Sequence, residues 1–469
     1  MSAVESFLDD LAARGMRVHS LLVHRGGATT LDLWQWPHEP DLKHKLHSAT
    51  KSFTATAVGF AEAEGLLDLE DPVVKFFELP EPPGENLSRM RVRDLLTMRT
   101  GHARGLSGAT TRLRKTGWAG EFLEEPVVER PGRTFRYSST TSHVLSAIVQ
   151  EVAGEPVDEY LRPRLFEPLG ITDYDWERDP DGVSSGGNGL SLRSRDLLSF
   201  GVLYLQDGVW EGERVLPAGW VRKASAPHVL RAVSGEWNGK ELLSAGPDAV
   251  ANSGYGYQFW TNKDGSYAAS GLFGQECMVF PDQDAVVVVT GAMPDPEYHD
   301  LPRMLREAFR RVFAEPSENL DRRIERAREP EPLDAPGERP VFARTYDFEA
   351  NEQGVRSLSV EATADSVRLG VEDDRGTHTL DHGLEKWVRQ RTGVSVGRLH
   401  HSYQDDAAPI LAGAKWAGDE LELTWHFLEG PFIDRLTLRF EGDDVVLDHR
   451  TNVNSGPTAL PPARGTVRA

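Results

Sequence analysis

The spacing of apolar and polar residues predicts a domain of mixed helices and strands in the first two thirds of the chain. Apolar residues at helical spacing predict helices over 4–14, 92–98, 142–152, 157–165, 195–206 and 301–313, and one more that begins near residue 48. Strand-like composition bounded by turn residues predicts strands over 18–24, 31–36, 135–137, 254–260, 276–280 and 285–290. Strands and helices occupy both ends of this region, with helices between them. We therefore expect an α+β fold: an antiparallel sheet flanked by N- and C-terminal helices, with an inserted helical subdomain.

The pattern changes after the last of these helices. The segment 316–340 is rich in proline and charge, which is typical of a linker. Beyond it, apolar and polar residues alternate over 421–427 and 436–440, with short turns between the strands. We therefore divide the chain into a first domain over 1–315, a linker over 316–340, and an all-β barrel or sandwich over 341–469.

Composition and charge narrow the class of protein. The chain of 469 residues is 39% hydrophobic, enough for packed cores, and its 73 Asp and Glu against 52 Lys and Arg give a formal net charge of −21. Such an acidic surface argues against nucleic acid and anionic membranes as partners, and no apolar run has membrane-spanning length. The acidic N-terminus does not resemble a signal peptide, and a single cysteine, Cys277, is typical of a reducing compartment, so we expect a cytoplasmic protein.

Candidate chemistry starts with Ser48 and Lys51, three residues apart at the start of a predicted helix. Residues at this spacing share a helix face, so the Lys51 amine can reach the Ser48 hydroxyl. A serine hydroxyl is a weak nucleophile until a base takes its proton, and a lysine is such a base where burial favours its neutral form. Taken alone, the Ser-x-x-Lys spacing also fits a serine N-cap followed by a solvated lysine.

Two later stretches extend this pair, Phe135-Arg136-Tyr137-Ser138-Ser139 and Ala268-Ala269-Ser270-Gly271-Leu272-Phe273-Gly274-Gln275. With them the chain resembles the serine β-lactamase and penicillin-binding-protein superfamily, whose boxes are S-x-x-K, Y-x-N, and K-T-G or H-x-G. It is most similar to the class-C-related branch of esterases, D-aminopeptidases and 6-aminohexanoate-oligomer hydrolases. The resemblance covers roughly residues 10 to 315. The C-terminal domain resembles the lipocalin-like barrels appended to some of these hydrolases.

The resemblance implies a role for each matching residue. Ser48 would be the acylated nucleophile, Lys51 its base or proton relay, and Tyr137 the shuttle that moves a proton between nucleophile, leaving group and water. The lysine ammonium would stabilise the phenolate form of Tyr137. Backbone N–H groups of Ser48 and Leu272 would form the oxyanion hole. The substrate-binding residues would be Ser139, Ser270, Gly271 and Gln275.

Two positions depart from the family pattern. Ser139 stands where the second box has asparagine, and Ala269 where the third box has lysine or histidine. The missing cation argues against β-lactamase and D-Ala-D-Ala peptidase activity and favours an esterase or amidase, unless another cation such as an arginine replaces it. We therefore expect a serine hydrolase without metal or cofactor that acts on small ester, amide or peptide substrates, and we leave homo-oligomerisation open. An acyltransferase with the same acyl-enzyme and a non-catalytic binding protein are the alternatives.

Several further patterns have other interpretations. Lys115-Thr116-Gly117 matches K-T-G but precedes Tyr137, so we interpret it as a solvated turn. Residues 182–186 match the G-x-S-x-G nucleophile elbow without the strand that the elbow needs before it, and we expect a loop there. We interpret His44 and His47 as surface histidines and not as metal ligands. Core packing is expected of Cys277, Trp387, Trp416 and Trp425, with a cavity lined by the tryptophans as the alternative.

Overall fold

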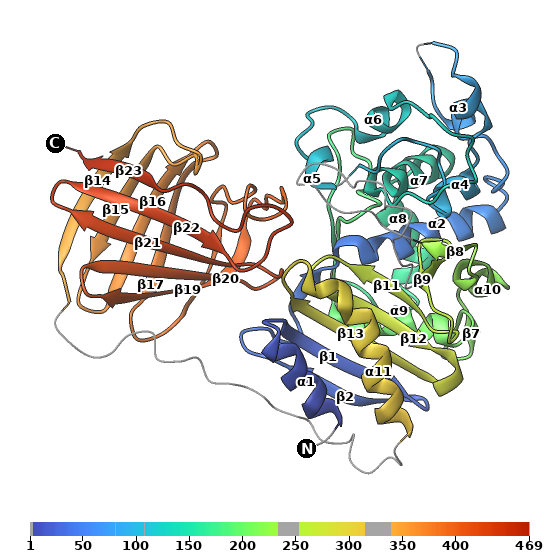
Figure 1. Cartoon of the computed structure of the whole chain (residues 1–469), viewed down its shortest axis with the longest axis horizontal. Helices are drawn as coiled ribbons and strands as arrows, with labels where there is room; N and C mark the ends of the chain where they lie inside the picture. Colours follow the sequence, from blue (N-terminus) through green and yellow to red (C-terminus); the bar gives the residue numbers. More distant parts are fainter. Residues whose placement is uncertain (1–2, 80, 107, 233–252, 315–338, 469) are drawn as a thin grey trace.

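The computed structural model describes residues 3–79, 81–106, 108–232, 253–314 and 339–468. Figure 1 shows a domain of sheet and helices, coloured blue to yellow, and beside it a β-barrel in orange and red. The predicted fold class, an antiparallel sheet with terminal helices and a helical insertion followed by an all-β barrel, is confirmed. Within the described ranges, none of the helices combines the length and the hydropathy of a membrane span.

An eight-stranded antiparallel sheet forms the centre of the first domain, with the order β2-β1-β13-β12-β11-β10-β9-β8 among the described residues. Its strands are β1 (Arg17–Arg25), β2 (Ala28–Trp34), β8 (Val229–Ala232), β9 (Ser253–Tyr255), β10 (Trp260–Thr261), β11 (Tyr267–Gly271), β12 (Gln275–Phe280) and β13 (Ala285–Ala292). The central strands β12 and β13 are buried along their whole length, because helices cover both faces of the sheet.

Two groups of helices cover the two faces (Figure 1). On one face lie α1 (Ala3–Ala13) and α11 (Leu301–Ala314), where the rings of Phe7 and Phe309 meet edge to face at 5.8 Å. On the other lie α2 (Thr50–Ala63) and α9 (Ser194–Leu205), together with the inserted subdomain. The remaining helices are α3 (Glu85–Arg89), α4 (Val92–Leu96), α5 (Gly108–Thr111), α6 (Trp118–Glu124), α7 (Ser139–Ala153), α8 (Val157–Leu161) and α10 (Trp220–Ser225).

Short elements connect these parts. The 3-10 turns are η1 (His47–Ala49), η2 (Val73–Phe76), η4 (Pro281–Gln283) and η5 (Glu297–Asp300), and η3 (Arg162–Phe166) is a π-helical turn. The minor strands are β3 (Lys43–Lys45), β4 (Asp175–Trp176), β5 (Leu190–Arg193), β6 (Val209–Trp210) and β7 (Glu213–Arg214). Of these, β3 leads directly into η1 and pairs with β5, so this small sheet brings the segment before Ser48 onto the inserted subdomain.

The helix that follows Ser48 is held by packing on all sides. Apart from its last turn, α2 is buried. Phe53 stacks on Phe200 at 3.9 Å, and a Cβ at Gly59 would lie 2.4 Å from the ring of Trp220, so the close contact requires glycine. Dense packing of this kind leaves little freedom, and it therefore fixes the position of Ser48 relative to the sheet.

The C-terminal barrel is formed by the strands β14 (Phe342–Phe348), β15 (Ser357–Ala362), β16 (Ser366–Asp373), β17 (Gly376–Gly383), β18 (Val388–Thr392), β19 (Ala408–Ala417), β20 (Glu420–Phe427), β21 (Ile433–Glu441), β22 (Asp444–Thr451) and β23 (Ala463–Val467). The sheet closes on itself where β17 pairs with β19. Its interior is filled by side chains such as Trp425 and Tyr346, both 0% exposed. A cavity at its mouth measures about 20 Å³, room for a single water.

The expected core positions of Trp425 and Cys277 are thus confirmed, since both are buried. The other two tryptophans are only partly buried. Trp416 packs against the barrel core, and Trp387 lies 5.3 Å from the ring of Trp36 in the first domain. These contacts account for the two tryptophans by packing.

Three local predictions need correction. Residues 135–137 belong to no strand of the described sheets, because they run into the N-cap of α7. The run 254–260 is divided between β9 and β10. The predicted helix 157–165 passes from α8 into the π-helical turn η3 at Pro163, which has no N–H to continue the α-helical pattern. Nearly all of the predicted linker 316–340 lies outside the described residues, so the division of the chain stays a prediction.

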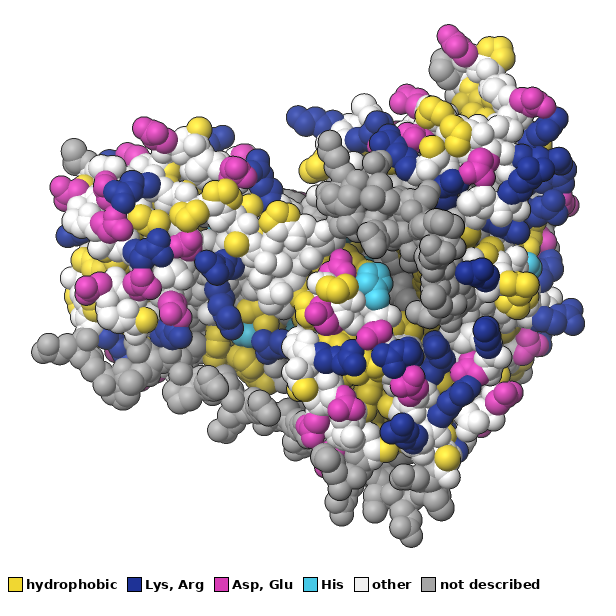
Figure 2. Space-filling view, in the orientation of Figure 1, with side chains coloured by type: hydrophobic (Ala, Val, Ile, Leu, Met, Phe, Trp, Pro, Cys, Tyr) yellow, Lys and Arg dark blue, Asp and Glu magenta, His cyan; other side chains and the backbone are white. Residues whose placement is uncertain are grey.

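The side-chain charges on one face of the molecule are mixed in sign. Figure 2 shows Lys and Arg side chains interspersed with Asp and Glu over both domains, and a hollow in the outline where the barrel meets the inserted subdomain. The net charge of −21 is therefore not gathered into one acidic patch on this face.

Candidate active site

Ser48 lies in the turn η1 that leads into α2, and it keeps part of its surface exposed. The preceding His47 has a φ of 48°, in the left-handed region that residues other than glycine rarely adopt. The end of β11 approaches this turn closely, since a Cβ at Gly271 would lie 2.1 Å from the carbonyl oxygen of Leu46. Only glycine therefore lets the third-box strand reach the turn that carries Ser48.

Lys51 is 1% exposed and contacts the expected partner. Its Nζ lies 2.9 Å from Ser48 Oγ, 3.2 Å from Ser139 Oγ and 2.6 Å from the carbonyl oxygen of Gly187. Burial lowers the pKa of Lys51 well below its usual range, and the positive charge of Arg112 lowers it further. In its neutral form, which this shift favours, the amine can give its two N–H groups to Ser139 and Gly187 and keep its lone pair for the Ser48 hydroxyl.

Tyr137 reaches the same point from the extended segment before α7. Its phenol hydrogen-bonds with the Ser48 side chain, its ring lies 4.8 Å from Lys51 Nζ, and it stacks on Trp260 at 5.6 Å. Burial raises the pKa of Tyr137, and the hydrogen bond to Ser48 opposes this rise only in part. The expectation of a stabilised phenolate is therefore wrong, because burial disfavours the charged forms of both side chains and makes the Tyr137 phenol a weaker acid than a free tyrosine.

The turn after β11 carries the proposed oxyanion donor Leu272. The side-chain amide of Gln275 donates to the Leu272 carbonyl at 3.2 Å and to the Gly291 carbonyl at 2.9 Å, and its oxygen accepts from the Gly291 N–H at 3.1 Å. Gln275 is 0% exposed. We therefore correct its expected contact with substrate: its amide supports the backbone of the turn.

Ser270 pairs with a buried carboxyl that sequence analysis missed. Its Oγ donates to Glu276 Oε1 at 2.9 Å, across the neighbouring strands β11 and β12. Burial raises the pKa of Glu276 to about 8, and the hydrogen bond from Ser270 opposes the rise. Glu276 is therefore largely uncharged at neutral pH, and Ser270 is oriented by it.

The loop 186–189 supplies contacts that no single-sequence pattern identified. A Cβ at Gly187 would lie 2.6 Å from the Ser139 carbonyl oxygen, so glycine is needed to bring its own carbonyl to Lys51. The side-chain oxygen of the next residue, Asn188, accepts from Arg112 Nη2 at 2.8 Å. The sequence signal for this loop is the pair of glycines before Asn188. It indicates a close backbone approach, but it does not indicate that the Gly187 carbonyl contacts Lys51.

Arg112 brings a positive charge close to Lys51 and Asn188. Its guanidinium makes hydrogen bonds of 2.8 Å to both carboxylate oxygens of Glu177, and its side chain is 3% exposed. Burial opposes its charge, but Glu177 and Tyr403 outweigh that effect and raise the pKa of Arg112. An arginine thus does lie close enough to Lys51 to lower its pKa, with its own charge already paired by Glu177.

The K-T-G match, the G-x-S-x-G match and the two histidines lie outside the cluster around Ser48 and Lys51 or play no direct part in it. Lys115 and Thr116 are exposed in a bend, as predicted for a solvated turn. Ser184 of the G-x-S-x-G match is 0% exposed, and its Oγ donates to Asp158 at 2.7 Å. The interpretation of His44 and His47 as surface residues is wrong. Both are buried, His44 against His19 at 3.0 Å and His47 against the barrel.

Comparison with known proteins identifies the family to which the chain belongs and a relative of similar sequence. The model of the beta-lactamase family matches residues 3–308, so the chain belongs to this family. The chain is 29% identical over 297 residues to the 6-aminohexanoate-dimer hydrolase of Paenarthrobacter ureafaciens, covering 59% of this chain and 73% of that protein.

Two solved structures extend the comparison of folds. The octameric penicillin-binding protein homologue from Pyrococcus abyssi matches 99% of both chains with a TM-score of 0.51 and 16% identity. EstCE1, a hydrolase with promiscuous acyltransferase activity, matches 65% of this chain and 97% of its own with a TM-score of 0.51 and 18% identity. These two structures confirm the fold, and the match of the family model confirms the superfamily resemblance.

Proposed function

We propose that this protein is a serine hydrolase that cleaves small ester or amide substrates through an acyl-enzyme on Ser48. The observation that carries the proposal is the meeting of three groups that are distant in the chain. Lys51 Nζ lies 2.9 Å from Ser48 Oγ, and the Tyr137 phenol hydrogen-bonds with the same side chain. A nucleophile, a base and a proton donor within hydrogen-bond reach are what acyl transfer requires.

Acylation follows from the protonation states. The lone pair of neutral Lys51 takes the Ser48 proton as Oγ forms a bond to the substrate carbonyl carbon. The N–H groups of Ser48 and Leu272 stabilise the oxyanion of the tetrahedral intermediate. As the bond to the leaving group breaks, the Tyr137 phenol protonates that group, and the Lys51 ammonium returns a proton to Tyr137. The Ser48 proton thus ends on the leaving group.

Deacylation uses the same groups in reverse. Water attacks the acyl carbonyl and passes its proton through Tyr137 to Lys51, and the second tetrahedral intermediate is stabilised by the same two N–H groups. When this intermediate collapses, Ser48 Oγ leaves and takes the proton back from Lys51. The products are a carboxylic acid and the enzyme in its starting state, without any other reactant.

The substrate class follows from the charges beside the site. Ala269, at the position of the family's third-box cation, is 1% exposed and packs in the core. The guanidinium of Arg112 is neutralised by Glu177 at 2.8 Å. Neither position offers an unpaired cation to a substrate carboxylate, which supports uncharged esters and amides over β-lactams. The relative named 6-aminohexanoate-dimer hydrolase supports hydrolysis as the reaction.

The test is the loss of activity in Ser48→Ala. We expect hydrolysis of p-nitrophenyl acetate to fall to the background rate, and a fluorophosphonate to add one covalent group at Ser48 of the wild type, read by mass spectrometry. Ser184→Ala is the matched control, because that buried serine belongs to the G-x-S-x-G match and has no place in the mechanism. Full activity in Ser48→Ala rejects the proposal.

An acyltransferase with the same acyl-enzyme is the second candidate, favoured by the structural likeness to EstCE1. Adding an alcohol or an amine to the assay separates the two. A transferase yields mainly the new ester or amide, whereas a hydrolase yields mainly the acid. Absence of any Ser48 adduct with fluorophosphonates, esters and β-lactams alike would favour the non-catalytic binding protein.

A further inference from the structure

The loop 393–407 of the barrel lies against the residues that flank Ser48 and Leu272. Its His401 ring lies 6.4 Å from the ring of His47, the neighbour of Ser48, and 6.5 Å from the ring of Phe273, the neighbour of Leu272. Phe273 is 0% exposed and belongs to the same apolar cluster as the barrel core. The barrel therefore packs directly on the turns that carry the nucleophile and the oxyanion donor.

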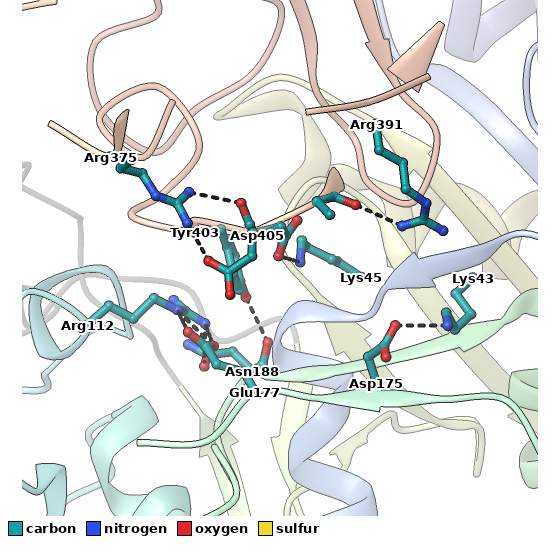
Figure 3. A network of polar contacts seen from close by, with 12 residues as sticks. Lys43, Lys45, Arg112, Asp175, Glu177, Asn188, Arg375, Arg391, Tyr403 and Asp405 are labelled. Atoms are coloured by element: carbon teal, nitrogen blue, oxygen red, sulfur yellow. Dashed lines mark hydrogen bonds and ion pairs between the residues drawn. The ribbon is translucent and has the colours of Figure 1, made fainter. Parts of the chain in front are cut away.

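Tyr403 of the same loop reaches deeper (Figure 3). Its hydroxyl donates to the Asn188 carbonyl at 2.7 Å, and the guanidinium of Arg112 lies over its ring at 3.6 Å. Tyr403 and Asn188 are each 5% exposed. Because the contact is dry, its hydrogen bond and its cation–π interaction are both stronger than they would be in water.

The hydrogen bond from Tyr403 to Asn188 affects the position of the proposed base, Lys51. The residue before it, Gly187, provides the carbonyl that accepts from Lys51 Nζ at 2.6 Å. The Asn188 side chain is fixed in turn by Arg112 at 2.8 Å, whose guanidinium is stacked on Tyr403. Tyr403 of the barrel thus contacts both the Asn188 backbone and Arg112, the partner of the Asn188 side chain. Both contacts hold the segment whose Gly187 carbonyl orients Lys51.

The loop is held in place on both sides. Within the barrel, His400 binds Asp434 at 2.8 Å, and the Gln404 side-chain oxygen accepts from two backbone N–H groups at 3.0 Å. Towards the first domain, Asp405 forms an ion pair with Lys45 at 2.9 Å (Figure 3). Lys45 ends the strand β3 that leads into the Ser48 turn. The loop is therefore preorganised where it meets the site.

We propose that the barrel completes the active site: Tyr403 is a positioning residue that holds the Gly187–Asn188 backbone against Lys51, and His401 forms a wall that limits the acyl group bound at Ser48. This inference rests on the proposed serine-hydrolase function. Burial lowers the pKa of His401 to about 3, with Arg112 and Lys51 contributing, so the wall is uncharged at neutral pH.

The first experiment compares two Tyr→Phe variants of the full chain. Tyr403→Phe keeps the ring beneath Arg112 and removes the hydroxyl that binds Asn188. We expect kcat for p-nitrophenyl acetate to fall about tenfold with little change in KM, since small displacements of a catalytic group are costly. The acid limb of the kcat/KM profile should move to lower pH, because a less firmly held Gly187 carbonyl stabilises the Lys51 ammonium less.

Tyr346→Phe is the matched control, because the hydroxyl of this buried barrel tyrosine has no hydrogen-bond partner among the described residues. We expect its kinetics and pH profile to equal those of the wild type. A Tyr403→Phe variant that melts like the wild type and matches Tyr346→Phe in kcat and in pH profile overturns the positioning role.

The second experiment tests the wall. His401→Ala should raise kcat/KM for p-nitrophenyl octanoate relative to the acetate by about tenfold, because a removed side chain admits additional methylenes. An unchanged ratio in this folded variant overturns the wall.

The outcome of fluorophosphonate labelling keeps the two proposals apart. An unlabelled Ser48 in the wild type defeats the hydrolase and this inference with it. A labelled Ser48 together with unaltered Tyr403→Phe and His401→Ala enzymes defeats only the inference.

Discussion

Two buried ionisable side chains behave in opposite ways in the two domains. In the first domain, the hydrogen-bond partners of Lys51 among the described residues are hydroxyl and carbonyl oxygens, so burial lowers its pKa, with the charge of Arg112 adding to the effect. In the barrel, Asp434 accepts hydrogen bonds from His400 at 2.8 Å and from His449 at 2.9 Å. Burial alone would raise the pKa of Asp434, but the two histidines outweigh it and hold that pKa well below its usual range.

The difference shows how partners decide what burial does. A buried amine without a counter-charge gives up its proton, which is the state a general base needs. A buried carboxylate with two donors keeps its charge and joins β21, β22 and the loop 393–407. In the first domain, burial thus favours the reactive form of Lys51. In the barrel, the buried Asp434 carboxylate holds the loop 393–407, which packs beside the residues around Lys51.

The largest expected effect is on activity. Lys51→Met removes the base and leaves an apolar side chain of similar length in the buried site. We expect the rate of Ser48 acylation to fall by about 10³-fold or more, while the protein stays folded because no buried charge loses its partner. Single-turnover kinetics with p-nitrophenyl acetate and a thermal melt check both halves. Wild-type acylation in this variant would remove Lys51 from the mechanism.

The second effect is on stability. Asp434→Asn removes the charge that two buried histidines contact, and we expect a loss of about 3 kcal/mol in the free energy of unfolding. The folded pKa of Asp434 lies below the unfolded value, so its stabilisation is present above about pH 4 and is lost as the pH falls through the folded pKa. Urea unfolding measures this.

Asp406→Asn is the control for that measurement, since the Asp406 side chain is 97% exposed. We expect it to change stability by less than about 0.5 kcal/mol. Equal stabilities of the two variants would contradict the comparison between Lys51 and Asp434.

The third prediction concerns buried histidines that, like Lys51, contact no carboxylate among the residues that the structure describes. His44 contacts His19, which stacks on His38 at 3.6 Å, and burial lowers the pKa of His44 to about 4. Between about pH 6.5 and 4 the unfolded chain takes up a proton at this residue and the folded chain does not. The free energy of unfolding therefore decreases as the pH is lowered through that window.

Replacing His44 by Gln should reduce the stability difference between pH 7 and pH 5 by about 2 kcal/mol, because the titrating group is gone. Urea unfolding at the two pH values gives this difference. His299→Gln is the matched control, with a side chain 59% exposed, and should retain the wild-type difference. The same pH dependence in both variants would show that the burial of His44 does not cost it a proton.

Much of the first domain is predictable from the sequence because its signals are local. Helical spacing around Leu305 and Phe309, and the hairpin before Ala285, depend on residues close in the chain, and the structure has both. The serine, lysine and tyrosine were found because their boxes are short. The failures share a cause as well. Residues 135–137 and the two histidines His44 and His47 were misjudged because contacts with distant segments decided their conformation or burial.

By itself, the sequence determined the α+β class, the all-β C-terminal domain, and the positions of Ser48, Lys51 and Tyr137 in their boxes, since periodicity and motif spacing are carried by neighbouring residues. Only the tertiary structure decided that burial lowers the pKa of Lys51 and raises that of Tyr137, that Gln275 supports a backbone turn, and that Tyr403 of the barrel binds Asn188 beside the base. Protonation depends on desolvation and on charges from the whole fold, and a contact between residues 215 positions apart leaves no trace in local spacing.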